Sequence, residues 1–346
     1  MQMTNTSRPG LIAAWLFILA GLIALMVTVG GATRLTDSGL SITEWDLVMG
    51  SLPPMSDAAW AEVFEKYKTI PEYEEVNFGM SLAEFKEIFW WEWSHRNLGR
   101  FIGLFVFFPL LYWSVRGVVK GGLRLRLWAI FLLVGLQGAI GWFMVASGLS
   151  ERVDVSQYRL ALHLGTAFIL FGLVVWQWIA LVRPPGRAAT KAGLGRLTLV
   201  FGAALFCQII LGAFVAGLRA GKTYNTWPLM DGQFVPEGYF NGAAGLSHMF
   251  ETIEAVQFNH RTGAYLIFVF AAFLMLKTWN GGKARGYGAA IFCGVFLQML
   301  LGIWTLVAVV PMSLGLLHQL GALMLLALTI VAAYDLSGSK TISPQN

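Results

Sequence analysis

The feature that most constrains the fold is a series of eight apolar runs, each long enough to cross a lipid bilayer. A membrane-spanning helix needs about 20 mostly apolar residues. The chain is 57% apolar and 12% charged, against roughly 45–50% and about 25% for ordinary soluble domains. The sequence therefore predicts an all-α integral membrane protein and argues against a nucleic-acid-binding protein. The expected transmembrane helices are residues 11–33, 96–118, 125–147, 159–182, 196–218, 258–278, 286–310 and 314–336.

Basic residues are concentrated in alternate loops. One side of the membrane carries thirteen Lys and Arg against a single acid, Asp335. By the positive-inside rule this side, with both termini, is cytoplasmic. Residues 34–94 and 219–255 are then long periplasmic loops, and we expect a multi-pass protein of the bacterial inner membrane. The thirteen basic residues are Arg8, Arg116, Lys120, Arg124, Arg126, Arg183, Arg187, Lys191, Arg196, Lys277, Lys283, Arg285 and Lys340.

The first long loop contains two helix signals. Ser81 and Glu84 have the spacing of a capping box, so we expect a helix that starts there and continues into the second span. Earlier in the loop, between Ser56 and Pro71, apolar residues recur at helical spacing, which predicts a short amphipathic helix. These apolar residues are Trp60, Val63, Phe64 and Tyr67.

The chain contains the same unit twice. Each half has four spans that start from the same side, which indicates parallel repeats. The sequence thus predicts two pseudo-symmetric four-helix bundles, in domains 1–190 and 191–346. The matching segments are the span ends at Arg34 and Arg219, HRNLGRF at His95 and HRTGAY at His260, ALHLGTA at His163 and LLHQLGA at His318, and LQGAIG at Gln137 and LQMLLG at Gln298.

Each half places two histidines near the outer ends of its even-numbered spans: His95 and His163 in the first, His260 and His318 in the second. Two imidazoles at one depth in a bundle are typical of bis-histidine haem ligation. Copper or zinc is an alternative, but neither pair has a third ligand of the required type within the spans. His248 has no counterpart in the repeat, and we expect it to be a solvated bystander.

Several arginines lie near these histidines or at the ends of odd-numbered spans. Guanidinium groups pair bidentately with carboxylates, so these residues are candidates for holding haem propionates. Binding to interfacial lipid or to loop acids is the alternative for each of them. The candidates are Arg34, Arg96, Arg100, Arg159, Arg219 and Arg261.

The two halves differ in the residue three positions before their first histidine. Glu92 precedes His95, whereas Gln257 precedes His260, and residues three apart share a helix face. An ionisable group at this depth is costly and marks function. We expect Glu92 to be a general base or an electrostatic stabiliser in the half that binds substrate. A structural ion pair with Arg96 or Arg100 is the alternative.

These segments resemble heme A synthase, in particular its alphaproteobacterial and mitochondrial branch. The resemblance covers nearly the whole chain. The motifs that carry it are TRLTDSGLSITEWDLVMGSLPP from Thr33, EFKEIFWWEWSHRNLGR from Glu84, TYNTWPLMDG from Thr223, and the four histidine contexts.

The resemblance implies an oxidoreductase that converts the C8 methyl group of haem O to the formyl group of haem A. It implies successive hydroxylations and loss of water from a geminal diol. His95 and His163 would bind the substrate haem iron, His260 and His318 would bind a haem b cofactor, and Glu92 matches the family's essential glutamate. Many bacterial members carry a cysteine pair in the first outer loop, and residues 34–94 contain none. This difference puts a thiol mechanism in doubt here.

Two other functions stay open at this stage. One is a bis-histidine dihaem electron-transfer protein similar to cytochrome b, and the other is a haem or solute transporter. The partners that the resemblance implies are heme O synthase and the assembly of cytochrome oxidase, and self-association into a homo-oligomer is a further candidate. Cys207 and Cys293 lie within apolar runs and form no disulfide framework or CxxC motif, so we expect buried, inert thiols.

Overall fold

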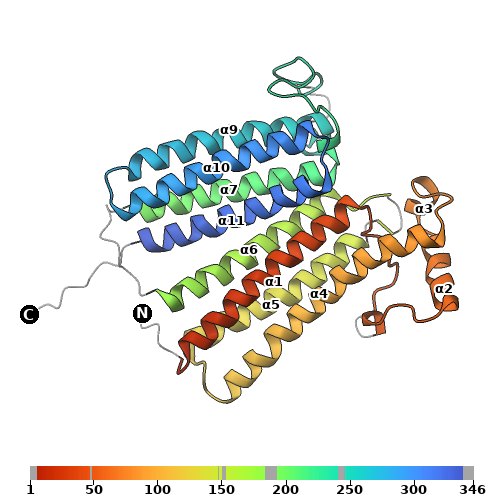
Figure 1. Cartoon of the computed structure of the whole chain (residues 1–346), viewed down its shortest axis with the longest axis horizontal. Coiled ribbons are helices and arrows are strands. Elements are labelled where there is room, and N and C mark those ends of the chain that lie inside the picture. The colour runs from red at the N-terminus through yellow and green to blue at the C-terminus, as the bar shows by residue number, and fades with distance from the viewer. Residues whose placement is uncertain are drawn as a thin grey trace, which may run out of the picture. The chain divides into compact units, whose positions relative to one another are not determined.

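The structure is a computed structural model that describes residues 6–46, 49–146, 148–149, 153–183, 193–240, 245 and 247–337. Helices make up most of it (Figure 1). The long ones are α1 (Pro9–Leu35), α4 (Leu82–Val115), α5 (Gly121–Val145), α6 (Gln157–Val182), α7 (Leu194–Gly217), α9 (Ile253–Thr278), α10 (Lys283–Val307) and α11 (Met312–Leu336). The short ones are α2 (Asp57–Tyr67), α3 (Pro71–Glu75), α8 (His248–Glu251) and the 3-10 turns η1 (Met49–Ser51) and η2 (Ala220–Lys222).

Eight helices among the described residues are long and apolar enough to cross a membrane, which confirms the predicted all-α, multi-pass class. The second of them, α4, begins well before the predicted span because the capping box forms. The Ser81 backbone N–H donates to Glu84 Oε2 at 2.8 Å, and the Glu84 N–H donates to Ser81 Oγ at 3.3 Å. The helix therefore runs without interruption from the outer loop into the span, as the sequence predicted.

The chain divides into two compact units, residues 21–170 and residues 1–20 with 171–346. The predicted domains, 1–190 and 191–346, follow the sequence repeat and remain a prediction, because their boundary lies outside the described residues. Three of the basic residues used to orient the chain, Arg187, Lys191 and Lys340, lie outside the described residues as well.

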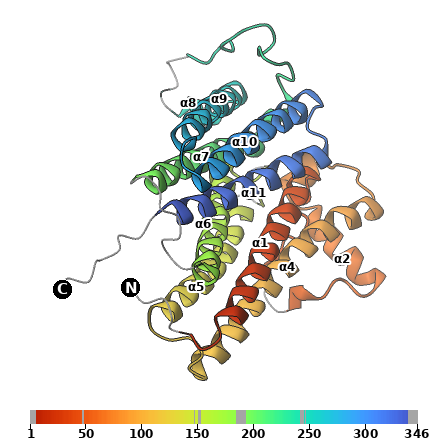
Figure 2. The same ribbon diagram turned by 60° about the vertical axis from the view of Figure 1, so that its left-hand side comes forward.

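Within the unit that contains the second half, α7, α9, α10 and α11 form a four-helix bundle. Helices α7 and α10 each pack on both α9 and α11, so α9 and α11 are diagonal neighbours. The four helices lie side by side in both views (Figures 1 and 2). Small residues bring them together: a methyl group at Gly202 of α7 would lie 3.3 Å from Cγ2 of Thr329 on α11. Close approach through small residues is typical of helices packed in a membrane.

In the unit of residues 21–170, the predicted amphipathic helix is α2, and its apolar face packs on the start of α4. Trp60, Phe64 and Tyr67 are buried in one cluster with Phe85 and Phe89 of α4. Aromatic pairs at offset or edge-on geometry add to the stability that burial supplies; the Trp60 and Phe89 ring centres are 4.9 Å apart. The outer loop is therefore a packed structure fixed to α4.

Burial raises the pKa of the Tyr67 phenol, and the nearby Glu72 carboxylate raises it further. The phenol is thus neutral at ordinary pH, and it accepts a hydrogen bond from Asn77 Nδ2 at 2.7 Å. This bond ties the end of α2 to the segment that precedes α4.

Asp335, the one acid predicted for the cytoplasmic side, lies in a polar cluster. Its carboxylate accepts from Arg183 and from the Tyr287 hydroxyl, and Arg183 also donates to that hydroxyl at 3.0 Å. The acid thus joins the end of α6 to α10 and α11, which gives its presence among basic residues a structural reason.

Candidate functional site

Two histidines of the second half face each other across their bundle. The ring centres of His260 on α9 and His318 on α11 are 6.4 Å apart, and the ring planes meet at 81°. A metal ion bound at about 2 Å by one nitrogen of each ring, with about 1.1 Å from nitrogen to ring centre, would separate the centres by about 6 Å. The pair therefore has the separation that a shared metal ion requires.

Each of the four predicted histidine ligands lies against a glycine of a neighbouring helix. A methyl group at these glycines would lie at or inside van der Waals contact with Cε1 of the ring, so a larger residue would displace the imidazole. The pairs are Gly30 with His95 (2.8 Å), Gly141 with His163 (3.3 Å), Gly212 with His260 (3.0 Å) and Gly302 with His318 (2.7 Å).

Three of the four rings also lie beside a glutamine amide, four residues before the corresponding glycine. In Gln208 and Gln298 the amide nitrogen also donates to the histidine's own backbone oxygen, at 2.8 and 2.7 Å. The amide thereby joins the ring to its helix. The distances between Nε2 and Nδ1 are 3.0 Å for Gln208 and His260, 3.2 Å for Gln298 and His318, and, in the amide orientation that satisfies both its ends, 3.0 Å for Gln137 and His163.

These surroundings fit a haem. A metal-binding histidine normally donates a hydrogen bond through its second ring nitrogen. The glutamine side chains lie beside that nitrogen, and each can accept the bond once its amide oxygen turns toward the ring. Within the described ranges, no group of three or more His, Cys, Asp or Glu gathers where it could hold a metal ion. Two histidines per site suit haem ligation, because the porphyrin supplies the remaining nitrogens.

Glu92 is 2% exposed, and its carboxylate is fully engaged. Oε1 accepts from Arg96 Nε at 3.0 Å and Nη2 at 2.6 Å. Oε2 accepts from the Ser41 hydroxyl at 2.8 Å and the Ile42 N–H at 2.7 Å. The ion pair with Arg96 that the sequence left open is therefore present. Arg96 also donates to the backbone oxygens of Ile42 at 2.7 Å and Glu44 at 2.8 Å, so the pair fixes the loop after α1 to α4.

Gln257 occupies the matching place in the second half, with the hydrogen bonds to the loop reversed. Its Nε2 donates to the backbone oxygens of Ala220 at 2.8 Å and Thr223 at 2.5 Å. Arg261 Nη2 donates to Gln257 Oε1 at 3.1 Å and to the Tyr224 oxygen at 2.6 Å. Both halves thus fix a loop by a residue pair four positions apart, but only the first half uses a charged pair.

The other arginines predicted to hold propionates also contact protein groups. Arg219 has left-handed backbone (φ 52°) at the start of η2. A propionate at any of these residues would have to share or replace the present acceptors, and the assignment stays a prediction. The acceptors are Asp37 (3.4 Å) and Asp154 (3.0 Å) for Arg34, the Asp46 oxygen for Arg100 (2.7 Å), and the Phe143 oxygen for Arg159 (2.6 Å).

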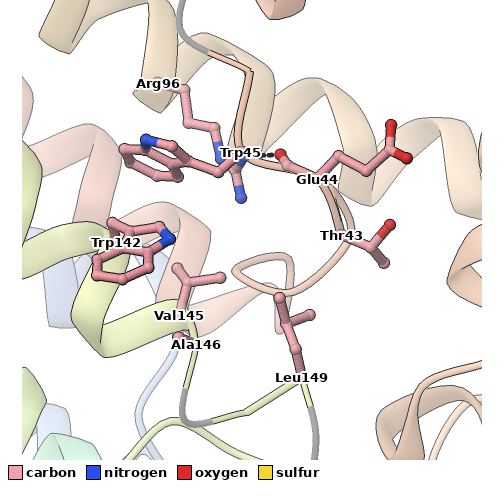
Figure 3. Close-up of a pocket in the computed structure, with 8 residues that line it drawn as sticks. All are labelled: Thr43, Glu44, Trp45, Arg96, Trp142, Val145, Ala146 and Leu149. Atoms are coloured by element: carbon pink, nitrogen blue, oxygen red, sulfur yellow. Dashed lines mark hydrogen bonds between the residues drawn. The ribbon is translucent and has the colours of Figure 1, made fainter.

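A small cavity of about 50 Å³ lies beside Arg96 (Figure 3). The loop residues Thr43, Glu44 and Trp45 form one wall, and Arg96 lies over the Trp45 ring, 5.1 Å from its centre. Sites for small organic ligands occupy roughly 300–1,000 Å³, so this cavity suits water rather than a haem. It places solvent-sized space next to the Glu92–Arg96 pair.

A sequence model of a family described as COX15-CtaA, cytochrome oxidase assembly protein, matches residues 13–330. The chain belongs to this family. It is 49% identical over 354 residues to the heme A synthase of Bradyrhizobium diazoefficiens, with 99% of this chain and 97% of the relative covered. It is 46% identical over 340 residues to that of Maricaulis maris (96% and 98% covered). For Caulobacter vibrioides the identity is 48% over 336 residues (96% and 97% covered). These matches confirm the resemblance to heme A synthases.

Sequence reasoning missed the glutamines and glycines around the histidines. The signal was present as a Gln-x-x-x-Gly spacing in three spans, at Gln137, Gln208 and Gln298, and residues four apart share a helix face. Gln137 and Gln298 mark the sequence repeat, but the spacing to the glycine alone does not show that each amide meets a histidine ring.

Two minor expectations have clear outcomes. His248 begins α8, and its Nε2 lies 2.9 Å from the Gly238 oxygen, so it helps to hold the second outer loop. The expectation of buried thiols was wrong: Cys207 and Cys293 are unpaired and exposed on α7 and α10, on helices that are long and apolar enough to face lipid.

Proposed function

We propose that the chain is a heme A synthase that oxidises the C8 methyl group of haem O to the formyl group of haem A. Each of two successive hydroxylations would replace a C–H bond with a C–OH bond in a two-electron oxidation whose oxidant is external to the chain, and the resulting geminal diol would lose water to give the formyl group. The observation that carries this proposal is the repeated histidine site with a buried carboxylate, Glu92, beside only one copy. The heme A synthase names of the relatives support it.

In this proposal the two halves bind different haems. His95 and His163 hold the iron of haem O, and His260 and His318 hold a haem b cofactor. Haem b would relay electrons one at a time. The protein's part in the second half is to orient the rings, through Gln208 and Gln298, and to leave room for them at Gly212 and Gly302.

We assign Glu92 an electrostatic role in preference to that of a general base. A carboxylate offers about four acceptor positions, and Arg96, Ser41 and Ile42 already fill them. To accept a proton, Glu92 would have to release one of these donors. A fixed negative charge one helical turn from His95 requires no such change and can stabilise positive charge that develops nearby.

A dihaem electron-transfer protein remains the second candidate. The observation in its favour is the shared glycine and glutamine environment of His163, His260 and His318 in both halves, since an electron carrier needs two similar sites. An electron carrier would leave haem O chemically unchanged, so the product distinguishes the two functions.

The cellular setting belongs to the same proposal. We place the protein in the bacterial inner membrane with both termini in the cytoplasm, receiving haem O from heme O synthase and passing haem A toward cytochrome oxidase assembly. Self-association is a further part of it. Reporter fusions at residues 190 and 346 should be active only with a cytoplasmic enzyme, and activity of a periplasmic reporter there would contradict the orientation.

The test of the function is to co-express the chain with a heme O synthase in a host that lacks haem A. Extracted haems are identified by chromatography and mass spectrometry, for the wild type and Glu92→Ala together. Haem A in the wild type alone supports the proposal. Haem O that stays unchanged in aerobic cells, beside protein that carries haem b, would favour the electron carrier.

A further inference from the structure

The histidine environments differ at one position, which lies four residues before the contacting glycine. Gln208, Gln298 and Gln137 occupy it for His260, His318 and His163. Met26 occupies it in α1, four residues before Gly30, which contacts His95.

The Met26 side chain reaches the turn of α4 that follows His95. Its methyl carbon would lie 3.3 Å from a methyl group at Gly99. In the second half, Gln208 reaches the equivalent turn, where its Oε1 fills the space above Gly263. The two side chains thus occupy corresponding spaces, one with an amide and one with a thioether.

His95 consequently lacks the hydrogen bond that the other rings have. Its Nδ1 is buried and has no hydrogen-bond partner among the residues that the structure describes. An amide offers both a donor and an acceptor, so Gln208 or Gln298 can accept from a protonated Nδ1 by turning its oxygen toward the ring, with loss of its hydrogen bond to the histidine's backbone oxygen. When Nε2 binds a metal, Nδ1 carries the proton, and a thioether is only a weak acceptor for it.

We infer that Gln137, Gln208 and Gln298 are positioning residues for their histidines, and that His95 is the ligand that can detach from its haem iron. Loss of a partner to a metal-binding histidine weakens metal binding by about 10–100-fold. A detachable ligand beside a fixed one, His163, suits a haem that must arrive and leave as substrate and product, whereas two fixed ligands, His260 and His318, suit a haem that is retained. This inference rests on the proposed function, because it assumes haems at both sites.

The experiment exchanges the two side chains and measures carbon monoxide binding. Carbon monoxide binds ferrous haem only where an axial position opens. Wild type, Met26→Gln, Met26→Leu and Gln208→Met are purified from cells that make haem O. Total haem is measured by type, and the fraction that binds carbon monoxide is read from reduced difference spectra. Met26→Leu is the control, because it removes the thioether without adding an amide.

In the wild type, only the first-half haem should bind carbon monoxide. Met26→Gln should reduce the rate of binding about tenfold or more relative to Met26→Leu. Gln208→Met should make a second portion of the haem reactive. These results support the inference.

Equal carbon monoxide binding in Met26→Gln and Met26→Leu, with both haems present, would overturn the inference and leave the proposed function standing. So would a Gln208→Met protein that keeps both haems and binds no more carbon monoxide than the wild type. Wild-type protein that carries no haem would instead contradict the proposed function and the inference together.

Discussion

The surroundings of His95 and His260 differ on two sides, although each histidine occupies the same place in its half. On its own helix, His95 follows Glu92 and His260 follows Gln257. On the neighbouring helix, Met26 and Gln208 are the corresponding pair. A glycine of the neighbouring helix contacts the ring in both halves. The two halves therefore share the glycine contact that positions the ring. They differ in the charge and in the hydrogen-bonding side chain beside it.

The Glu92 and Gln257 contacts show how a charge can be introduced without loss of the fold. Each side chain holds the loop that follows the first helix of its half, and each has an arginine four residues later. The loop in the first half offers donors and the loop in the second offers acceptors, so each loop is complementary to its own residue. Exchange of the two residues should therefore disturb both structure and function.

The largest expected effect comes from Glu92→Gln. The amide nitrogen would face the Ile42 N–H, and the ion pair with Arg96 would be lost. We expect haem A formation per mole of protein to fall about 100-fold or more, because removal of one preorganised electrostatic group from a reacting centre costs about 10²–10³-fold in rate. The haem content should stay near the wild-type value. If Glu92→Gln forms as much haem A as the wild type, the negative charge of Glu92 has no part in the reaction.

Ser41→Ala separates the charge from the loop contact. It removes one donor to Oε2 and keeps the carboxylate and Arg96. A hydrogen bond to a charged group contributes about 1.5–3 kcal/mol, and the carboxylate keeps its other donors, so haem A formation should fall by about tenfold, well short of the loss in Glu92→Gln. If Ser41→Ala loses as much activity as Glu92→Gln, the role of Glu92 is to hold the loop.

Gln257→Glu tests the comparison from the other side. The new carboxylate would replace the donor to the Ala220 and Thr223 oxygens with a second acceptor. Arg261 compensates for the charge, but the unsatisfied oxygens should destabilise the fold by about 1–3 kcal/mol. The measurement is the apparent melting temperature in detergent, which should be lower for Gln257→Glu than for the reference variant Gln257→Ala. An unchanged melting temperature would show that the polarity of this contact is unimportant.

Gly302→Ala should weaken haem retention by the second half. The added methyl group would lie 2.7 Å from Cε1 of His318, so the ring must move away from its ligand position. Gly286→Ala on the same helix is the control, since nothing lies within 4 Å of its added methyl group. We expect several-fold faster loss of haem b in Gly302→Ala alone, measured by transfer to apomyoglobin. Equal rates would contradict the glycine contact as a determinant of ring position.

The smallest expected effect is that of Ser81→Ala, which removes the cap of α4 in the first half. Loss of a serine cap costs about 1 kcal/mol. The apparent melting temperature should fall slightly, haem binding should persist, and the amides of residues 81–84 should exchange hydrogen faster. Unaltered exchange would mean that the packing of α2 on α4 fixes this end without the cap.

Features encoded locally were predictable from the sequence. The spans follow from composition, α2 from the spacing of Trp60, Phe64 and Tyr67, and the start of α4 from Ser81 and Glu84. The contacts of Glu92 with Ser41 and Ile42 join residues about fifty positions apart, and no local pattern specifies them. The Met26 and Gln208 difference was visible in the sequence, but its meaning depends on which ring each side chain meets.

The central claim is that the two halves bind different haems for different purposes, and the haem composition of single-ligand variants tests it most directly. His163→Ala and His318→Ala are purified from cells that make haem O, and their haems are identified by mass spectrometry. The account predicts that His163→Ala loses haem O and haem A but keeps haem b, and that His318→Ala loses haem b. Loss of the same haem type from both variants would contradict the claim.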